Sequence, residues 1–324
     1  MNPVIFTDDL LGACSVIDEL KRRGRPPTVI SPSRLADLSF TLTLEEGAVG
    51  STILVGTPSQ SFEISPDSRI WRWKCGWPGA DDLIDPDPVI SEIKRSQYRV
   101  TLRAIWEAPA HWMNPYTADW RLDQSKLLGS SIARECGFEV PNSLLSDDPV
   151  SFKDFIEREG AEYFAIKPSA SWAAKRPDGT AIASYARRLS AKDALGYSAS
   201  VRHAPVLVQP YVQKAYEVRL TCVGEKTFAA RIDSQSSDQT SVDWRHYPAT
   251  PVAHDPWDIP ADIETIVRRF MGKSGLAYAA IDLIVTPAGK VVFLEANPAG
   301  QYLWIEELTG LPISAAIADW LTEG

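Results

Sequence analysis

"VVFLEANPAGQYLWIEELTG", residues 291–310, begins as an apolar strand and then places Glu295 and Asn297 where that strand should end. Side chains two positions apart in a strand point to the same side, so these two residues can direct oxygen atoms at one point. Hard cations such as Mg²⁺ take oxygen ligands. The stretch therefore predicts a metal site at the end of a strand. An Asn-Pro turn beside a solvated glutamate fits the same residues and stays open at this point.

The composition is that of a folded protein with an acidic balance of charge. The chain has 324 residues, of which 44% are hydrophobic and 23% charged, enough for two or three lobes with substantial cores. The net charge is -9, and no basic run occurs in the sequence. Binding to nucleic acid is therefore not expected, because phosphate binding needs concentrated Lys and Arg.

The spacing of the cysteines and the length of the apolar runs indicate the cell compartment in which the protein is expected. The four cysteines are scattered without CxxC spacing, so neither a zinc site nor a disulfide framework is predicted. No apolar run reaches the roughly 18 residues that a membrane span needs, and the first residues show no export signal. We therefore expect a cytoplasmic protein that does not bind membranes.

Short β-rich runs alternate with helical patterns, which predicts an α/β or α+β fold. In the first part of the chain the expected strands are "VIFT", "STILVG", "SFEIS" and "RIWRWK". A helix is expected up to Arg23, and a second one in "SEIKRSQYRVTLRAIWEAP", ending near Pro109. These elements are expected to form one lobe over residues 1–115.

Two lysines hold informative positions in the next part of the chain. Lys126 lies in an expected helix over residues 121–136, where a lysine is usually solvated. Lys167 ends the β-rich run "YFAIKP", and a functional role is favoured because burying an ammonium without an anion is costly. The stretch over residues 169–184 is rich in small residues around a central Asp-Gly. It is either a mobile loop over phosphates or a plain hairpin.

Four charged residues are expected on two paired strands, "YEVRLTCV" and "KTFAARID", which a two-residue Gly-Glu turn connects. The period of two puts Glu217 with Arg219 on one face of the first strand, and Arg231 with Asp233 on one face of the second. This pattern favours a polar pocket floor. Cross-strand ion pairs on a wet sheet face are the alternative.

The last two expected strands, "YAAIDLIV" and "KVVFLEAN", are joined by a short turn. Pairing them places Asp282 beside Glu295 and Asn297. The three side chains are then close enough to bind one cation together.

The ordered set of motifs from Lys126 onward resembles the ATP-grasp ligases. It runs from Lys126 through Lys167-Pro168, "VQPYV", "YEVRL" and "AIDLIV" to "FLEANPAGQYLWIE", and covers roughly residues 114–324. Within that superfamily the chain is most similar to the graspetide macrocyclases, whose best-known members are the microviridin ligases. The motifs that favour this branch are "NPYTADWRLDQSK", "WRWK", "VDWRHY" and above all "NPAGQYLWIE".

The resemblance implies an ATP-grasp fold with a pre-ATP-grasp lobe over 1–115, a central lobe over 116–210 and a C-terminal lobe with the metal site over 211–324, with the nucleotide between the last two. It implies an ADP-forming ligase that activates Asp or Glu side chains of a ribosomal precursor peptide as acyl phosphates. Ser, Thr or Lys side chains then close ester or amide rings. A ligase that joins small amino acids or extends a peptide terminus is the alternative, and a binding protein without catalysis is a third hypothesis.

The resemblance also implies a role for each site residue. The residues expected to bind ATP are Lys126, Lys167, Gln209, Tyr211, Val212 and Glu217. The expected ligands of one or two Mg²⁺ ions are Asp282, Glu295 and Asn297. The residues expected to steady the γ-phosphoryl and acyl groups are Arg219 and Arg231, with Lys167. The candidates for contact with the core peptide are Asp233, Trp244, Arg245, Gln301 and Trp304.

The expected partner is a precursor peptide with a leader and a core that carries Thr, Ser or Lys together with Asp or Glu. The leader is expected to dock as a short helix on the central lobe, and a homodimer is compatible with the resemblance. His246 is either a general base or a surface histidine, and the surface role is favoured. Two departures from the family pattern bear on ATP. Pro210 removes one main-chain donor, and the loop expected over the phosphates is rich in Ala and Ser where glycine is common.

Overall fold

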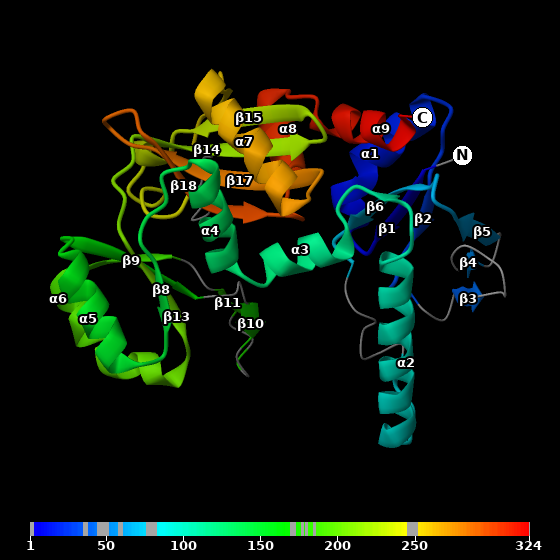
Figure 1. Cartoon of the computed structure of the whole chain (residues 1–324), viewed down its shortest axis with the longest axis horizontal. Helices are drawn as coiled ribbons and strands as arrows, with labels where there is room; N and C mark the ends of the chain where they lie inside the picture. Colours follow the sequence, from blue (N-terminus) through cyan, green and yellow to red (C-terminus); the bar gives the residue numbers. More distant parts are fainter. Residues whose placement is uncertain are drawn as a thin grey trace.

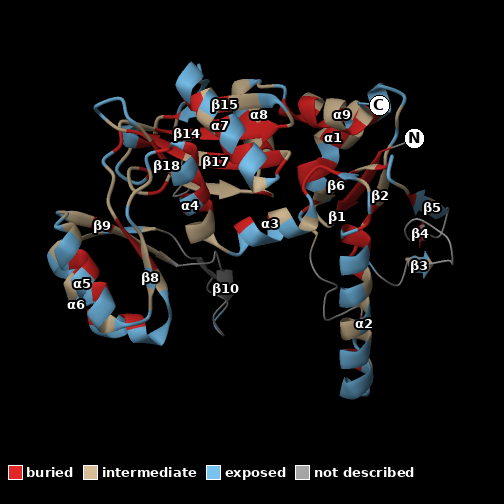
Figure 2. Ribbon diagram, in the orientation of Figure 1, coloured by how far each residue is buried: buried red, intermediate tan, exposed pale blue. Residues whose placement is uncertain are grey.

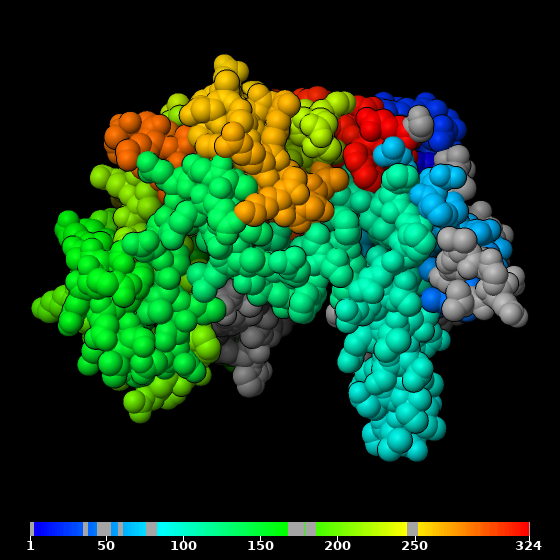
Figure 3. Space-filling view, in the orientation of Figure 1, coloured from blue at the N-terminus to red at the C-terminus, as the bar shows by residue number. Residues whose placement is uncertain are grey.

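The computed structural model describes residues 3–34, 38–43, 52–57, 61–75, 83–168, 173–175, 178, 181–183, 186–244 and 252–323. Within them the chain mixes sheets and helices in three groups, arranged along the long axis of the molecule (Figure 1). The space-filling view is hollowed between the projecting helix α2 and the opposite end of the molecule (Figure 3). None of the described helices is long and apolar enough to cross a membrane.

The N-terminal lobe (Val4–Trp112) is built on a parallel four-stranded sheet in the order β2-β1-β6-β7. Helix α1 connects β1 and β2. A smaller sheet of β3, β4 and β5 lies at the end of the molecule, and α2 projects away from the body (Figure 1). The bounds are β1 Val4–Thr7, α1 Leu10–Arg22, β2 Thr28–Ile30, β3 Ser39–Thr43, β4 Thr52–Gly56, β5 Ser61–Ile64, β6 Arg69–Trp73, α2 Pro88–Trp106 and β7 His111–Trp112.

The four strands expected in this lobe, β1, β4, β5 and β6, are found within one residue of their expected ends. Helix α2 begins at Pro88, before its expected start, because the side chain of Asp87 accepts a hydrogen bond from the N–H of Val89 at 2.8 Å and caps the helix. The sequence does not reveal β2, β3 or β7, which are short strands without a clear alternation of apolar residues.

Two helices, α3 (Tyr116–Asp123) and α4 (Lys126–Cys136), follow the N-terminal lobe. The prediction of one helix over 121–136 is wrong at its start, because the chain breaks after Asp123. The hydroxyl of Ser125 accepts from the N–H of Leu128 at 3.2 Å and caps α4. Lys126 is therefore the first residue of a helix and does not lie on a mid-helix face.

The central lobe (Leu144–Pro210) is an antiparallel four-stranded sheet in the order β12-β9-β13-β8, with α5 and α6 on one face (Figure 1). Its core contains Phe152, Phe155 and Phe164. The bounds are β8 Leu144–Ser146, α5 Pro149–Glu159, β9 Tyr163–Pro168, β10 Ala173–Lys175, β11 Ala181–Ala183, β12 Arg187–Ser190, α6 Ala191–Gly196, the 3₁₀ helix Ser198–His203 and β13 Val206–Pro210.

Strands β10 and β11 pair antiparallel with each other. Of the two alternatives for residues 169–184, a loop or a hairpin, this pairing is the hairpin. Residues 169–172, 176–177, 179–180 and 184 of this stretch lie outside the described residues. A role of the hairpin in covering phosphates stays a prediction.

The C-terminal lobe (Tyr216–Thr322) is built on an antiparallel five-stranded sheet in the order β16-β15-β14-β17-β18. Helices α4 and α7 cover one face with an apolar core that includes Val218, Leu220 and Phe293. Figure 2 shows this sheet as a largely buried layer. The bounds are β14 Tyr216–Val223, β15 Lys226–Ile232, the 3₁₀ helix Ser234–Ser236, β16 His254–Pro256, α7 Ala261–Ser274, β17 Tyr278–Val285, β18 Val291–Asn297, α8 Leu303–Thr309 and α9 Ile313–Thr322.

A β-bulge in β18 aims the acidic end of that strand. Phe293 pairs with Leu283 and Glu295 pairs with Asp282, so Leu294 is an extra residue between the two pairs. Phe293 lies in the apolar core, and strict alternation would turn Glu295 to the same face. The extra residue turns Glu295 to the face that Asp282 occupies, which is a known use of bulges beside functional sites.

The register between β14 and β15 corrects the expected pocket floor. Glu217 pairs with Ile232 and Arg219 pairs with Ala230, while Arg231 pairs with Val218. Paired residues share a face, so Arg231 lies on the opposite face of the sheet from Glu217 and Arg219. Its guanidinium stacks over the ring of Tyr216 at 4.3 Å. The expectation of four charged residues on one floor is therefore wrong.

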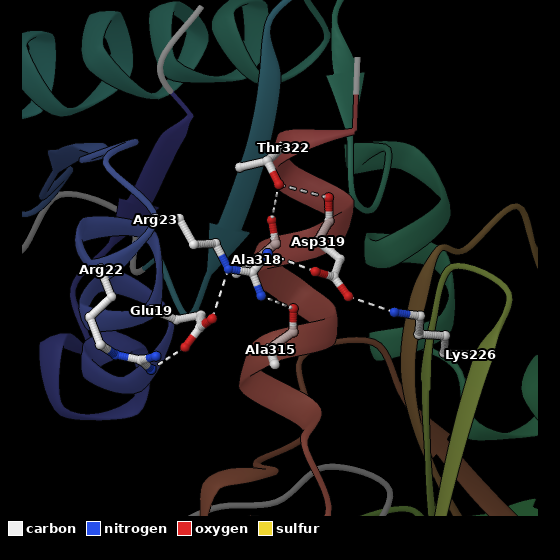
Figure 4. Close-up of polar contacts among 8 residues, drawn as sticks. All are labelled: Glu19, Arg22, Arg23, Lys226, Ala315, Ala318, Asp319 and Thr322. Atoms are coloured by element: carbon white, nitrogen blue, oxygen red, sulfur yellow. Dashed lines mark hydrogen bonds and ion pairs between the residues drawn. The ribbon is translucent and has the colours of Figure 1, made fainter.

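The N-terminal and C-terminal lobes share one apolar core. It joins Val16, Leu20 and Trp71 of the first lobe to Tyr302 and Ile317 of the last. Polar contacts between α1 and α9 close it at the surface (Figure 4). Arg23, directly after α1, binds Asp319 of α9 at 2.6 Å. On the side of α1, Glu19 binds Arg23 at 2.7 Å and pairs with Arg22, and on the side of α9, Asp319 also binds Lys226 of β15 at 2.5 Å.

Candidate functional site

A cavity of about 390 Å³ lies between the central sheet and one face of the C-terminal sheet. Its size is within the range of small-molecule sites. Thirteen of the predicted site residues line it: Lys126, Lys167, Gln209, Tyr211, Val212, Glu217, Arg219, Trp244, Asp282, Glu295, Asn297, Gln301 and Trp304. Arg231 and Asp233 do not, and Arg245 and His246 lie outside the described residues.

Asp282, Glu295 and Asn297 converge at one point of the cavity. Strands β17 and β18 place the two carboxylates opposite each other. The Nδ2 of Asn297 lies 3.3 Å from Oε1 of Glu295 and 3.5 Å from Oδ2 of Asp282. Among the described residues no group of three His, Cys, Asp or Glu side chains is poised for a metal. Asn297 directs its Nδ2 at both carboxylates, and a turn of its amide would bring Oδ1 to the same point as a third oxygen. Two carboxylates and an amide fit a hard cation such as Mg²⁺.

Two lysines face this acidic group. Lys126, at the start of α4, places its Nζ 3.0 Å from Oε2 of Glu295. Lys167 ends β9 on the opposite wall of the cavity. Burial by itself raises the pKa of Glu295. The charges of Lys167 and Lys126 outweigh this effect and lower the pKa to about 2. Glu295 is therefore ionised at neutral pH, and its negative charge is already matched by cations that could turn to a bound anion.

Arg219 is buried on the cavity floor between two partners. Its Nη1 donates to both carboxylate oxygens of Asp282, at 2.8 and 3.0 Å. Its Nη2 donates to the carbonyl of Gln301 at 2.9 Å. Gly300 permits this approach, because a Cβ there would lie 2.7 Å from Nη2 of Arg219. The structure thus holds Arg219 fixed beside the acidic group.

The opposite end of the cavity is formed where β13 leads into β14. The Nε2 of Gln209 donates to the hydroxyl of Ser143 at 2.8 Å, and the N–H of Tyr211 donates to the carbonyl of Tyr163 at 2.8 Å. Pro210 closes β13 as its last residue, where the missing N–H costs least. Main-chain groups at the end of a strand are suited to reading the edge of a planar base.

Lys214 is a cavity residue that sequence reasoning missed. Its Nζ donates to Oε1 of Glu217 at 2.6 Å and to the carbonyl of Val242 at 3.0 Å. Burial raises the pKa of Glu217, while the charge of Lys214 lowers it. A lysine three residues before a buried acid was the available signal. The carboxylate that is expected to bind ribose is thus held in place by an ion pair.

Aromatic side chains form one wall of the cavity. Trp244 stacks on Trp304 with ring centroids 4.6 Å apart, and His254 meets Trp304 edge-on at 5.4 Å. Both tryptophans line the cavity. His254 was not foreseen from the sequence, because β16 is short and carries no alternating pattern.

Solved structures with the same fold cover almost the whole chain. A RiPP-associated ATP-grasp ligase from Chryseobacterium gregarium, in complex with ADP and a leader and core peptide, has a TM-score of 0.85 at 25% identity, over 99% of this chain and 96% of that one. The macrocyclase MdnC from Microcystis aeruginosa, bound with precursor peptide MdnA, has a TM-score of 0.83 at 24% identity over 100% of both chains. The ATP-grasp ligase PsnB, complexed with a phosphomimetic variant of minimal precursor, Mg and ADP, has a TM-score of 0.74 at 20% identity, over 99% and 98% of the chains.

No protein-family model matches the chain, and no curated protein sequence matches it. The D-cycloserine synthetase DcsG shares the fold at a TM-score of 0.60 and 14% identity, over 99% of this chain and 98% of that one. The predicted ATP-grasp fold and the predicted resemblance to peptide macrocyclases are confirmed.

Proposed function

We propose that this chain, which has the fold of the RiPP-associated ATP-grasp ligases, is an ATP-dependent ligase that closes rings in a ribosomal precursor peptide. The observation that carries the proposal is the meeting of Asp282, Glu295 and Asn297 with Lys126 and Lys167 in one cavity. A ligase of the same fold in complex with ADP and a leader and core peptide, and a macrocyclase of the same fold bound with its precursor peptide, support the reaction class.

The cavity has residues suited to the phosphates, the adenine and the ribose of ATP. Lys126 and Lys167 bind the phosphates, since a compact ammonium suits a polyphosphate. The main chain of Gln209 and Val212, with Tyr211, lines the adenine, and Glu217 accepts from the ribose hydroxyls. Asp282, Glu295 and Asn297 would hold Mg²⁺, which when bound offsets the negative charge of the phosphates. We also propose the three-lobe division at residues 1–115, 116–210 and 211–324.

The reaction has two steps: phosphorylation of a carboxylate, and transfer of the acyl group to a hydroxyl or an amine. A carboxylate oxygen of a core Asp or Glu attacks the γ-phosphorus, and the bond from that phosphorus to the bridging oxygen breaks, which gives ADP and an acyl phosphate. A hydroxyl or amine of Ser, Thr or Lys then attacks the acyl carbon. The bond from that carbon to the phosphate oxygen breaks, phosphate leaves, and the acceptor gives up its proton to a base or to water. An ester or an amide ring results.

The chain's own residues serve this reaction by binding and orientation. Arg219 lies beside the acidic group and is suited to steady the phosphoryl oxygens or the acyl group. No nucleophile of the enzyme is required. Cys222 is not suited to that role, since burial raises the pKa of its thiol to about 12. The stacked Trp244 and Trp304 form the wall along which the core peptide lies.

The test is a reaction of the purified chain with ATP, Mg²⁺ and a peptide encoded beside its gene that carries Asp or Glu together with Ser, Thr or Lys. We expect peptide-dependent ADP release and a peptide mass lower by one water for each ring. ADP release with free amino acids but not with any such peptide would favour the small amino acid ligase. No ADP release with either would contradict the proposal.

A further inference from the structure

Lys74 brings a cation from the N-terminal lobe into the cavity. It follows directly on β6, in the motif "WRWK", and lines the cavity although all other cationic lining residues come from α4 or the two later lobes. Its Nζ lies 5.7 Å from the ring centroid of Trp73. Within the described part of the chain Lys74 has no acidic partner at ion-pair distance, whereas Lys126, Lys214 and Arg219 each have one.

The backbone at Lys74 is held in an unfavourable conformation. Its φ is +44°, and among the described residues it is the one residue other than glycine with a positive φ. An L-residue there is strained and glycine would not be, so the lysine side chain is kept at a cost in free energy. Strain of this kind gathers at functional sites, where the surrounding structure enforces it.

The neighbours of Lys74 place it at the end of the cavity away from the adenine side. Burial lowers the pKa of Lys74, the charge of Asp9 raises it, and the charge of Arg219 lowers it further. Asp9 is held by the N–H of Gly12 at 2.9 Å and by Nε2 of Gln301 at 3.1 Å. The carbonyl of Gln301 in turn accepts from Arg219.

Strand β14 gives the direction of the cavity floor. It runs from Glu217, beside the adenine side, to Arg219, beside the acidic group and Gln301. Lys74 lies toward this second end, because the charges that act on it are those of Arg219 and of Asp9, which binds Gln301. On the proposed function the γ-phosphate lies beside Glu295, so a group that approaches it meets this end of the cavity.

We propose that Lys74 binds the carboxylate of the peptide's acidic side chain and holds it for attack on the γ-phosphorus. The proposal rests on the proposed function. A carboxylate approaching a triphosphate is repelled, and its approach needs a cation that the phosphates do not already occupy. Lys126 and Lys167 are taken by the phosphates, and Arg219 is fixed between Asp282 and Gln301. Lys74 is the remaining cation with a side chain that has no ion-pair partner among the described residues.

The experiment compares Lys74→Ala, Lys74→Arg and Lys74→Gly with a matched control, Lys94→Ala. Lys94 lies on α2 in the same lobe and pairs with Asp85, which precedes the helix, and neither residue lines the cavity. Affinity for the non-hydrolysable nucleotide AMPPNP with Mg²⁺ is measured by calorimetry. The kcat and KM for the precursor peptide encoded beside the gene are measured by ADP release, and Tm by circular dichroism.

We expect Lys74→Ala to lower kcat/KM for the peptide by about tenfold to a hundredfold, the scale of one charged hydrogen bond, with nucleotide affinity within about twofold of wild type. Lys74→Arg should recover most of the loss. Lys74→Gly should lose as much activity as the alanine variant while its Tm stays equal or rises, because the strain is released. Lys94→Ala should match wild type in every measurement.

Three results would overturn the proposal. Unchanged kcat/KM in Lys74→Ala would remove the substrate role, and a tenfold loss of nucleotide affinity would make Lys74 a phosphate ligand. A lower Tm in Lys74→Gly would show a structural role. These outcomes differ from failure of the proposed function itself: a wild-type chain that binds AMPPNP but releases no ADP with the peptide would overturn both.

Discussion

The two faces of the five-stranded C-terminal sheet show how one element serves two purposes. On the face under α4 and α7, Leu220, Leu283 and Phe293 pack into a continuous apolar core. On the other face, Arg219 and Asp282 alternate with them along the same strands and line the cavity. The apolar face is held by burial, which has no directional demand.

The cavity face is held in a different way, because a buried charge is tolerated only when it is paired. Glu295 has Lys126, Glu217 has Lys214, and Asp282 has Arg219. Each pair keeps a group ready for a ligand at the cost of desolvation. Substitutions on the two faces should therefore have different effects. Those on the apolar face should lower the free energy of unfolding, and those on the cavity face should lower catalytic activity.

The largest effect is expected on the cavity face, from Glu295→Gln. The amide keeps the shape of the side chain but loses the charge that Lys126 and the metal need. ADP formation should fall about a thousandfold, equivalent to about 4 kcal/mol of transition-state stabilisation, with the Tm little changed. A coupled assay for ADP measures it. Turnover above a tenth of wild type would remove the metal assignment.

On the apolar face, Phe293→Ala should act on stability alone. The ring is fully buried against Phe138 and Phe270, with centroids 5.5 Å away in both cases. The loss should be about 3–5 kcal/mol in the free energy of unfolding, measured by urea denaturation, and Phe293→Leu should lose less. A loss below about 1 kcal/mol would show that this face is not the one that holds the sheet together.

Lys167→Ala tests the cation that the central lobe contributes. Affinity for AMPPNP with Mg²⁺ should fall by about 1.5–3 kcal/mol, the scale of a hydrogen bond to a charged group. The control is Lys226→Ala, because that lysine is half exposed and pairs with Asp319 outside the cavity. Equal affinities in the two variants would count against the phosphate role of Lys167.

The smallest effect is expected from Arg231→Ala, which compares two arginines on opposite faces. Arg231 is exposed and stacks on Tyr216, so its loss should cost at most about 1 kcal/mol of stability and change turnover by less than about twofold. Arg219→Ala should lower turnover far more. If both variants lost activity equally, the assignment of Arg231 to the non-catalytic face would be wrong.

The sequence was sufficient for the strands that carry the site, because β14 alternates apolar and polar residues while β17 and β18 are short apolar runs bounded by turns. It did not reveal the bulge at Leu294, because a leucine within an apolar run gives no signal of which face of the sheet it occupies. The face of Arg231 could have been predicted: the two-residue turn pairs Val223 with Lys226, and counting back from there pairs Glu217 with Ile232. The period of two fixes faces within a strand, and only the register fixes them between strands.

Lys74 and the start of α4 show what local patterns leave out. Lys74 reaches the cavity only because the N-terminal lobe packs against the C-terminal one, a contact between segments far apart in the chain. Lys126 was predicted in the middle of a helix, but the cap at Ser125 moves it to the first turn. One case depends on tertiary packing and the other on a single hydroxyl, and neither changes the hydrophobic periodicity.

The contact between α1 and α9 has a consequence for how the protein is made on the ribosome. Arg23 and Asp319 are 296 positions apart, and the apolar core beneath them takes residues from both ends of this span. At translation rates of about 5–20 residues per second, the nascent N-terminal segment waits roughly 15–60 s for α9. We expect Val16, Leu20 and Trp71 to stay uncovered during that time, and chaperones that hold apolar segments to bind the growing chain there.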